Sequence, residues 1–287
     1  MKSTLPRILI CTGLLALGAC SHVRSAATRG LIEDMAAATA RHDDVDLVVQ
    51  AVPTYILLLE GLLRSDGDNR DNLLTAAEVY LSYGTVVEMA DPLRARGLYG
   101  RAKEYGLRAL ANTRSGLAPL LNGPFAEFTA IDDKLRPEDL PVVFSASSAW
   151  GAWIASHTEA VSALAELPKV IHLMEWVLRQ DETYNNGSPH VFLGVYHASL
   201  PPMLGGRPDL SREHFQAALR ITQRQSLMVQ VLMARFYARQ TFDHDLYESL
   251  LHEVLNHENR GMGELTLQNA IAIRHARTLL EEADDFF

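Results

Sequence analysis

Histidines at a helical spacing are the residues of this sequence whose type and position most resemble a chemical site. His190 and His197 are seven residues apart. In a helix this spacing places both on one face but separates them by about 10 Å along the axis. Two imidazoles so far apart cannot share one metal ion unless the helix bends. We therefore predict no metal at these histidines and expect them to pack or to cap a helix.

A second group of amphipathic side chains follows the same periodicity. Trp150, Trp153 and His157 occur at intervals of three and four, so they form one stripe, which is either buried core or the lining of a channel. In a channel, the rings would supply apolar area and the polar tips would bind a ligand. The predicted ligand-binding residues are Trp150, Trp153, His157, Tyr184, Asn186, His190, Tyr196 and His197.

The motifs that most enzymes use for nucleophilic, metal or cofactor chemistry are missing from the sequence. It contains no His-Glu-x-x-His run, no Gly-x-Ser-x-Gly elbow and no Walker-type loop. Adjacent carboxylates at 132–133, 281–282 and 284–285 are typical of solvated helix ends. We predict that the protein is not an enzyme and has no catalytic residues, metal or cofactor, and an envelope hydrolase is the least favoured function.

A basic cluster interrupts an otherwise acidic chain, whose formal net charge is −9. The cluster consists of Arg94, Arg96, Arg101, Lys103 and Arg108. These charges either pair with Glu88, Asp91 and Glu104, or form a patch for an acidic partner protein or an anionic solute. In the second interpretation the partner-binding residues are Arg94, Arg96 and Arg101. Nucleic acid is not expected as a partner, because binding it requires a strongly basic surface.

Helices must position all of these residues. Apolar side chains recur at spacings of three and four, and strict alternation is absent, so no strand is predicted. Turn-forming residues at 65–69, 91–92, 122–124, 185–187 and 205–206 divide the chain into roughly ten to twelve helices. Proline favours the first turn of a helix, and we expect helices to begin at Pro53, Pro92, Pro137 and Pro168.

One short apolar pattern recurs along the chain. Copies that resemble the second helix of a tetratricopeptide repeat begin at Ala102, Val170, Ser211 and Tyr247. For the copy at Ser211, the first helix of the pair is predicted at 192–197. The predicted fold is all-α, a superhelical stack of degenerate tetratricopeptide-like hairpins, with a generic helical bundle as the alternative.

The N-terminus has the features of an export signal. Lys2 and Arg7 precede a short apolar run, and Leu17-Gly18-Ala19-Cys20 resembles a lipobox. We predict a signal peptide at 1–19, a tether with a short helix at 20–45 and one helical domain at 46–287. Cys20 is the predicted lipidation site, carrying acyl chains such as palmitate, although an ordinary secretory cleavage after Ala19 would also fit.

Maturation at this site has consequences for charge and anchoring. Removal of Lys2 and Arg7 takes the formal net charge from −9 to −11. Cys11 leaves with the signal peptide, so Cys20 is the last cysteine and no internal disulfide can form. We expect no later segment to span a membrane, so that attachment rests on the acyl anchor. Ser21 after the cysteine favours the outer membrane over the inner one.

Several segments together resemble the T-component proteins of tripartite ATP-independent periplasmic (TRAP) transporters. The stretches that carry the resemblance are Ala95–Leu110, Ala149–Trp153, Tyr184–Gly206 and Met228–Tyr237. The resemblance implies a periplasm-facing lipoprotein with a channel or cleft through its helical domain. It further implies binding of a periplasmic solute-binding protein and of a small organic or hydrophobic ligand, with a homotrimer as one form of self-association. The alternative function is a tetratricopeptide-like scaffold lipoprotein for envelope or outer-membrane assembly.

Overall fold

A computed structural model describes residues 34–200, 202–258 and 262–287 of the chain. The predicted signal peptide and Cys20 lie outside the described residues. Within them there are helices and turns but no strands, so the predicted all-α class is confirmed. Residues 34–40 are helical, in the region where a short first helix was expected.

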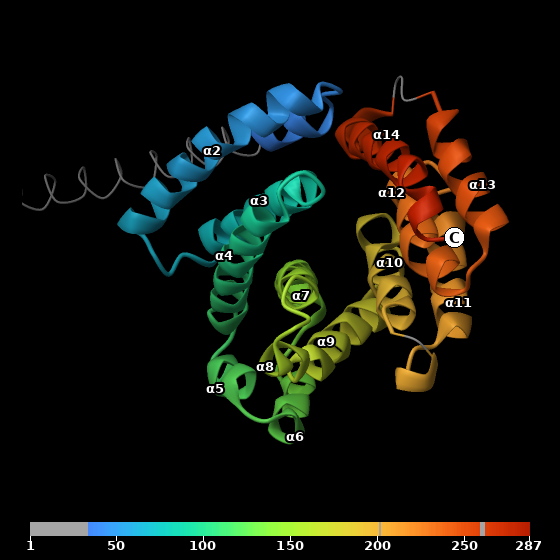
Figure 1. The fold of residues 1–287 in the computed structure, drawn as a ribbon. Helices are drawn as coiled ribbons and strands as arrows, with labels where there is room; N and C mark the ends of the chain where they lie inside the picture. The colour runs from blue at the N-terminus through green and yellow to red at the C-terminus, as the bar shows by residue number, and fades with distance from the viewer. Residues whose placement is uncertain (1–33, 201, 259–261) are drawn as a thin grey trace, which may run out of the picture.

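Thirteen further α-helices follow in the described part of the chain (Figure 1). The longer ones are α2 (Val45–Ser65), α3 (Arg70–Val87), α4 (Pro92–Ala111), α7 (Leu140–Ala155), α9 (Leu167–Gln180), α10 (Tyr184–Ala198), α11 (Pro208–Ile221), α13 (His244–Leu255) and α14 (Thr266–Glu281). The short ones are α5 (Leu117–Asn122), α6 (Phe125–Phe128), α8 (Val161–Leu164) and α12 (Leu227–Leu232). A π-helical segment, Met233–Ala238, continues α12.

Side-chain caps explain where several helices begin. The carboxylate of Asp44 accepts from the amide of Leu47 at the start of α2, and Asn69 and Asp91 cap α3 and α4 in the same way. Such a bond satisfies one of the amides that a helix start leaves unpaired. Pro92 and Pro168 lie in first turns as predicted.

The predictions for the other two prolines fare differently. Pro137 begins a short 3-10 turn, Pro137–Asp139, immediately before α7. The prediction that a helix begins at Pro53 is wrong, because Pro53 lies inside α2. The cap at Asp44 starts this helix earlier, and the helix continues through the proline although proline has no amide hydrogen to donate.

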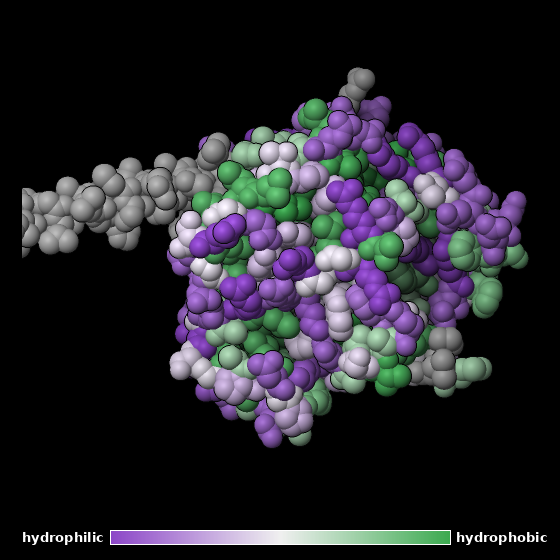
Figure 2. Space-filling model, turned by 60° about the vertical axis from the view of Figure 1, so that its left-hand side comes forward, coloured by the Kyte–Doolittle hydropathy of each residue, from purple (hydrophilic) through white to green (hydrophobic). Residues whose placement is uncertain are grey.

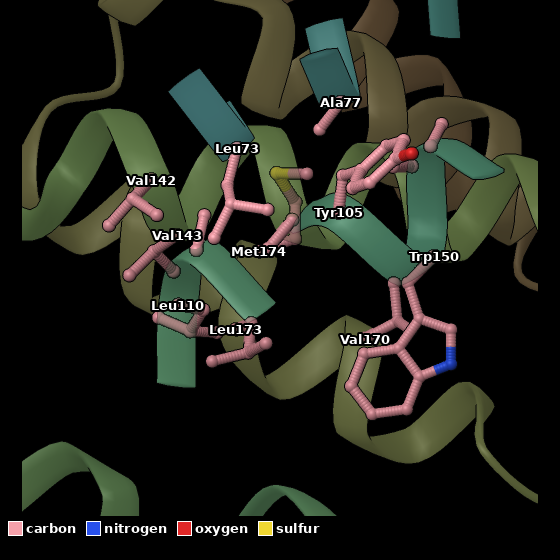
Figure 3. Close-up of a cluster of buried hydrophobic side chains, with 14 of the residues drawn as sticks. Leu73, Ala77, Tyr105, Leu110, Val142, Val143, Trp150, Val170, Leu173 and Met174 are labelled. Atoms are coloured by element: carbon pink, nitrogen blue, oxygen red, sulfur yellow. The ribbon is translucent and has the colours of Figure 1, made fainter. Parts of the chain in front are cut away.

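Two hydrophobic clusters form the core, and α10 joins them. The first cluster is built by α2 to α9 and the second by α11 to α14. Leu193 of α10 belongs to the first cluster, whereas Val191 and Val195 pack against the second. Figure 1 shows α10 between the two groups of helices. Inside the first cluster, Leu110, Val143 and Leu173 lie close together from three different helices (Figure 3).

Small residues allow the closest helix contacts. A Cβ on Gly106 of α4 would lie 3.0 Å from the Cα of Ala146 on α7, so these backbones touch. On α10, Gly194 faces the ring of Phe215, and its carbonyl accepts from the hydroxyl of Ser211 at 2.7 Å. The predicted partnership of 192–197 with the repeat copy at Ser211 therefore corresponds to packing of α10 on α11.

The outermost long helix, α2, bears on the expectation that no segment after the signal peptide can span a membrane. Judged by length and composition alone, α2 is long and apolar enough to cross a membrane, and it is the one such helix among the described residues. Its Glu60, however, accepts hydrogen bonds from the hydroxyls of Tyr80 and Tyr105 at 2.8 and 2.6 Å. Figure 2, which brings this side of the molecule forward, shows hydrophobic patches interrupted by hydrophilic residues. We therefore interpret α2 as an outer helix that packs on α3.

Candidate functional site

The predicted tryptophan stripe lies where α7 packs on α4. Trp150 is 2% exposed, and its indole Nε1 donates to the carboxylate of Glu166. The same carboxylate accepts from Lys103 Nζ at 2.5 Å. Lys103 Nζ also lies 3.4 Å from the ring centroid of Trp153, a close cation–π contact. In Figure 3 the ring of Trp150 lies at the edge of the buried cluster.

His157 continues this stripe and meets the basic cluster. Its ring lies 4.7 Å from that of Trp153, and Arg96 Nε donates to its Nε2 at 2.9 Å. Arg96 also forms a 2.5 Å ion pair with Glu159. The polar atoms of Trp150 and His157 are thus already bonded to other residues of the fold, and a ligand role for Trp150, Trp153 and His157 stays a prediction.

A histidine cluster lies between α10 and α11. His190 is buried, and its Nδ1 lies 2.9 Å from Nδ1 of His214. The rings of His197 and His214 are parallel, with centroids 5.7 Å apart, and Tyr196 lies against His197. His214 from α11 thus fills the gap between two histidines that are too far apart to meet directly.

His214 is a residue that the sequence reasoning missed. The predicted pairing of 192–197 with the helix starting at Ser211 was the signal that could have placed it beside His197. Burial lowers the pKa of all three imidazoles, and for His214 the value falls to about 4, helped by the charges of His190 and His197. Among the described residues, no group of three or more His, Cys, Asp or Glu has a geometry suited to a metal ion.

The start of α10 directs Tyr184 away from that cluster. Asn185 and Asn186 have left-handed backbones, with φ of 46° and 59°, and Gly187 completes this kink. Asn186 is exposed at the kink. The ring of Tyr184 instead makes an edge contact with Phe144 of α7, with centroids 5.2 Å apart. The predicted ligand-binding residues are therefore distributed over three separate places in the fold.

Glu78 of α3 faces the same region as Tyr184. Its side chain is exposed to solvent, yet surrounding protein desolvates the carboxylate and raises its pKa to about 7. The Glu78 charge in turn raises the pKa of Tyr55 on α2 and of Tyr184 on α10. We name Tyr55, Glu78, Phe144 and Tyr184 the Glu78 group.

A polar network connects the two halves of the core. Glu88, just after α3, accepts from the hydroxyl of Tyr99 at 2.9 Å and from Arg235 at 3.4 Å. Arg235 lies in the π-helical segment, a feature often found at functional sites. Burial is the chief cause that lowers the pKa of His275 on α14, and the positive charge of Arg235 lowers it further. This network was not foreseen from the sequence.

The basic cluster is partly neutralised in the fold. Arg101 pairs with Glu104 at 3.3 Å, and Arg96 pairs with Glu159 as described above. Arg94 is exposed and lies over the ring of Tyr83, 5.1 Å from its centroid, without an ion pair to another described residue. Leu93, the residue before Arg94, is 81% exposed. Val161 of α8 is 82% exposed. We name Leu93, Arg94, Arg96 and Val161 the α4–α8 face.

The comparisons with known proteins agree with the resemblance seen in the sequence. The sequence model of the family described as TRAP transporter T-component matches residues 41–287, which is all but the first part of the chain. The chain therefore belongs to the TRAP transporter T-component family. No curated protein matches it significantly.

Proposed function

We propose that this protein is a lipoprotein accessory to a TRAP transporter, anchored at Cys20 and facing the periplasm, which binds the solute-binding protein of that system. The family match over residues 41–287 supports the transporter association. The lipobox at Leu17–Cys20 supports export and acylation, with the outer membrane as the destination. This family match is the observation on which the proposal chiefly depends. The proposed anchor, docking surface and ligand site describe how the protein would perform this role.

The α4–α8 face is the proposed docking surface for the solute-binding protein. Around the axis of α4, position 93 lies between positions 94 and 96, so an exposed leucine is flanked by two arginines. The ion pair of Arg96 with Glu159 holds the start of α4 against the segment that leads to Val161. Apolar side chains surrounded by arginine are typical of interface centres. Arg94 keeps its charge available for an acidic partner.

A small organic ligand is proposed to bind within the helical stack, at the Glu78 group. Its aromatic rings supply apolar area, and its polar atoms make no hydrogen bond to another described side chain. Ligand sites combine these two features. The tetratricopeptide-like hairpins, a channel through the stack and assembly into a homotrimer remain parts of this proposal.

Co-purification from detergent-solubilised membranes tests the proposed partner. The wild-type protein should co-elute with a periplasmic solute-binding protein. Leu93→Asp should weaken that association by about 10- to 100-fold, because fully burying a leucine contributes about 1.5–3 kcal/mol. Arg94→Glu should weaken it further at low salt. Arg277→Glu, a charge reversal at an exposed position on α14, is the matched control and should bind normally.

The alternative function gives a different result in the same experiment. Elution of assembly factors or peptidoglycan enzymes, without a solute-binding protein, would support a general scaffold and contradict the transport role. Equal recovery of the solute-binding protein with wild type, Leu93→Asp and Arg94→Glu would keep the transport role but refute the α4–α8 face.

A further inference from the structure

The outward side of α2 carries a long uncharged face that the described part of the chain leaves exposed. Three of its leucines are well exposed, with Leu47 at 52%, Leu57 at 72% and Leu58 at 45%. At the rise of an α-helix the face is about 20 Å long. We name it the α2 outer face, and its exposed positions are Leu47, Gln50, Ala51, Thr54, Leu57, Leu58 and Gly61.

The charged residues of α2 lie at the ends of this face or on another side of the helix. Glu60 accepts hydrogen bonds from tyrosines of α3 and α4. Asp46 in the first turn pairs with Arg274 of α14 at 2.8 Å, and Arg64 lies in the last turn. The α2 outer face therefore offers a partner neither charge nor the aromatic and arginine side chains that are typical of protein interface centres.

The opposite side of α2 is already packed. Val48, Ile56, Leu59 and Leu63 are buried, and α2 contacts α3 and α14. Figure 1 shows α3 on one side of α2 and no further helix of the described residues on the other. A helix that is apolar all round is normally covered all round, so the α2 outer face lacks its expected cover.

The proposed acyl anchor brings a lipid surface close to this face. Residues 21–33 separate Cys20 from Asp34, the first described residue, and a chain of this length spans at most about 50 Å. The helical residues 34–40 come shortly before α2, so α2 is the first long described helix after the anchor. Tethering raises the effective concentration of the lipid at α2, and even a weak contact is then formed often.

We propose that the α2 outer face lies against the phospholipid leaflet that holds the acyl anchor, with its leucines inserted among the headgroups. The inference rests on the proposed anchor at Cys20 and adds an interaction surface to it. The helix lies parallel to the membrane and does not cross it, because its other side is packed in the core. Neutral phospholipid suffices, since the face is uncharged and the chain is acidic overall.

A fluorophore at position 57 of the acylated mature chain tests the inference. Acylation uses the thiol of Cys20, the last cysteine of the sequence, so Leu57→Cys introduces the one thiol that can be labelled. The protein is bound to phosphatidylcholine vesicles that contain a lipid with a nitroxide near its headgroup. Fluorescence at position 57 should fall at least about twofold, because interfacial helices bury their apolar face about 5–10 Å deep. Glu213→Cys, at an exposed position on α11, is the matched control and should change little.

The same preparations separate this inference from the proposed anchor. Protein that floats with the vesicles but shows equal quenching at positions 57 and 213, or quenching at neither, would keep the anchor and overturn the inference. Failure to float would contradict the anchor and, with it, the inference. A blue-shifted emission at position 57 in the Cys20→Ala form without lipid would show that a second copy of the chain covers the face, which would also overturn it.

Partition of the Cys20→Ala form onto phosphatidylcholine vesicles measures the face alone. Binding should be weak and should need a high lipid concentration. Leu57→Asp should lower the partition coefficient by about tenfold, because it removes one leucine from the lipid contact. Phe242→Asp, at a position that is 79% exposed before α13, should have no effect. Raising the salt from about 0.1 M to about 1 M should not weaken binding. Equal partition with and without Leu57→Asp would contradict the inference.

Discussion

The histidine cluster between α10 and α11 should make the protein less stable in mild acid. His190 and His214 share a hydrogen bond between their Nδ1 atoms at 2.9 Å, which requires that one of these nitrogens carry no proton. His197 stacks on His214 from the other side. Burial and these neighbours lower the pKa of His214 from 6.5 to about 4. Protonation of this imidazole is therefore resisted in the folded state.

The sign of the effect follows from proton binding. In the unfolded chain His214 takes up a proton as the pH falls through 6.5, whereas in the folded chain it does so only near pH 4. Because the unfolded state binds more protons in this window, the free energy of unfolding is highest above about pH 6.5 and falls as the pH drops toward 4. Of this pKa difference, the part that acts between about pH 7 and pH 5 corresponds to a loss of about 2 kcal/mol in the free energy of unfolding. His214 is only partly buried. Because solvent screens its charge, we expect a smaller loss in the free energy of unfolding, about 1 kcal/mol.

Urea unfolding followed by circular dichroism at about pH 7 and pH 5 measures this term. Between about pH 7 and pH 5, the free energy of unfolding of wild type should fall by about 1 kcal/mol more than that of His214→Gln. The comparison of variants matters because the raised pKa of Glu78 works in the opposite direction, stabilising the fold as the pH falls. His252→Gln, at an exposed position on α13, serves as control. If His214→Gln showed the same change with pH as wild type and His252→Gln, the reasoning about the cluster would be refuted.

Two other perturbations test the packing and the anchor. Phe215 is fully buried against Gly194, so Phe215→Ala should lower the free energy of unfolding by about 3–5 kcal/mol, and a loss below about 1 kcal/mol would contradict the close α10–α11 contact. Cys20→Ala should move the exported protein from the membrane pellet to the soluble fraction, because acyl burial contributes about 0.8 kcal/mol per methylene. Retention of that variant in carbonate-washed membranes would argue against a lipid anchor.

Local signals in the sequence predicted the helical fold well. Turn residues at 65–69 and 91–92 coincide with observed helix ends, because Asn69 and Asp91 cap the next helices with their own side chains. Pro53 misled the prediction, since the cap at Asp44 starts α2 earlier and the helix tolerates the proline. Helix boundaries were predictable where the determining contact was local.

The candidate site was harder to predict, because its contacts join residues far apart in the chain. His190 and His197 were recognised as a pair that could not meet directly, but His214 comes from the next helix. Nothing in the helical pattern of α3 distinguishes Glu78 from other surface carboxylates. The Glu78 charge raises the pKa of Tyr55 on α2 and of Tyr184 on α10, and the sequence pattern does not specify those neighbours.

Site-specific photo-crosslinking at position 93 in intact cells tests the proposed transport role most directly. A photoreactive residue replacing Leu93, which is 81% exposed at the start of α4, should form a covalent adduct with the solute-binding protein of a TRAP system. The same residue at position 277 should not form this adduct. Crosslinking at position 93 to envelope assembly factors, or equal crosslinking of the solute-binding protein at positions 93 and 277, would contradict the account.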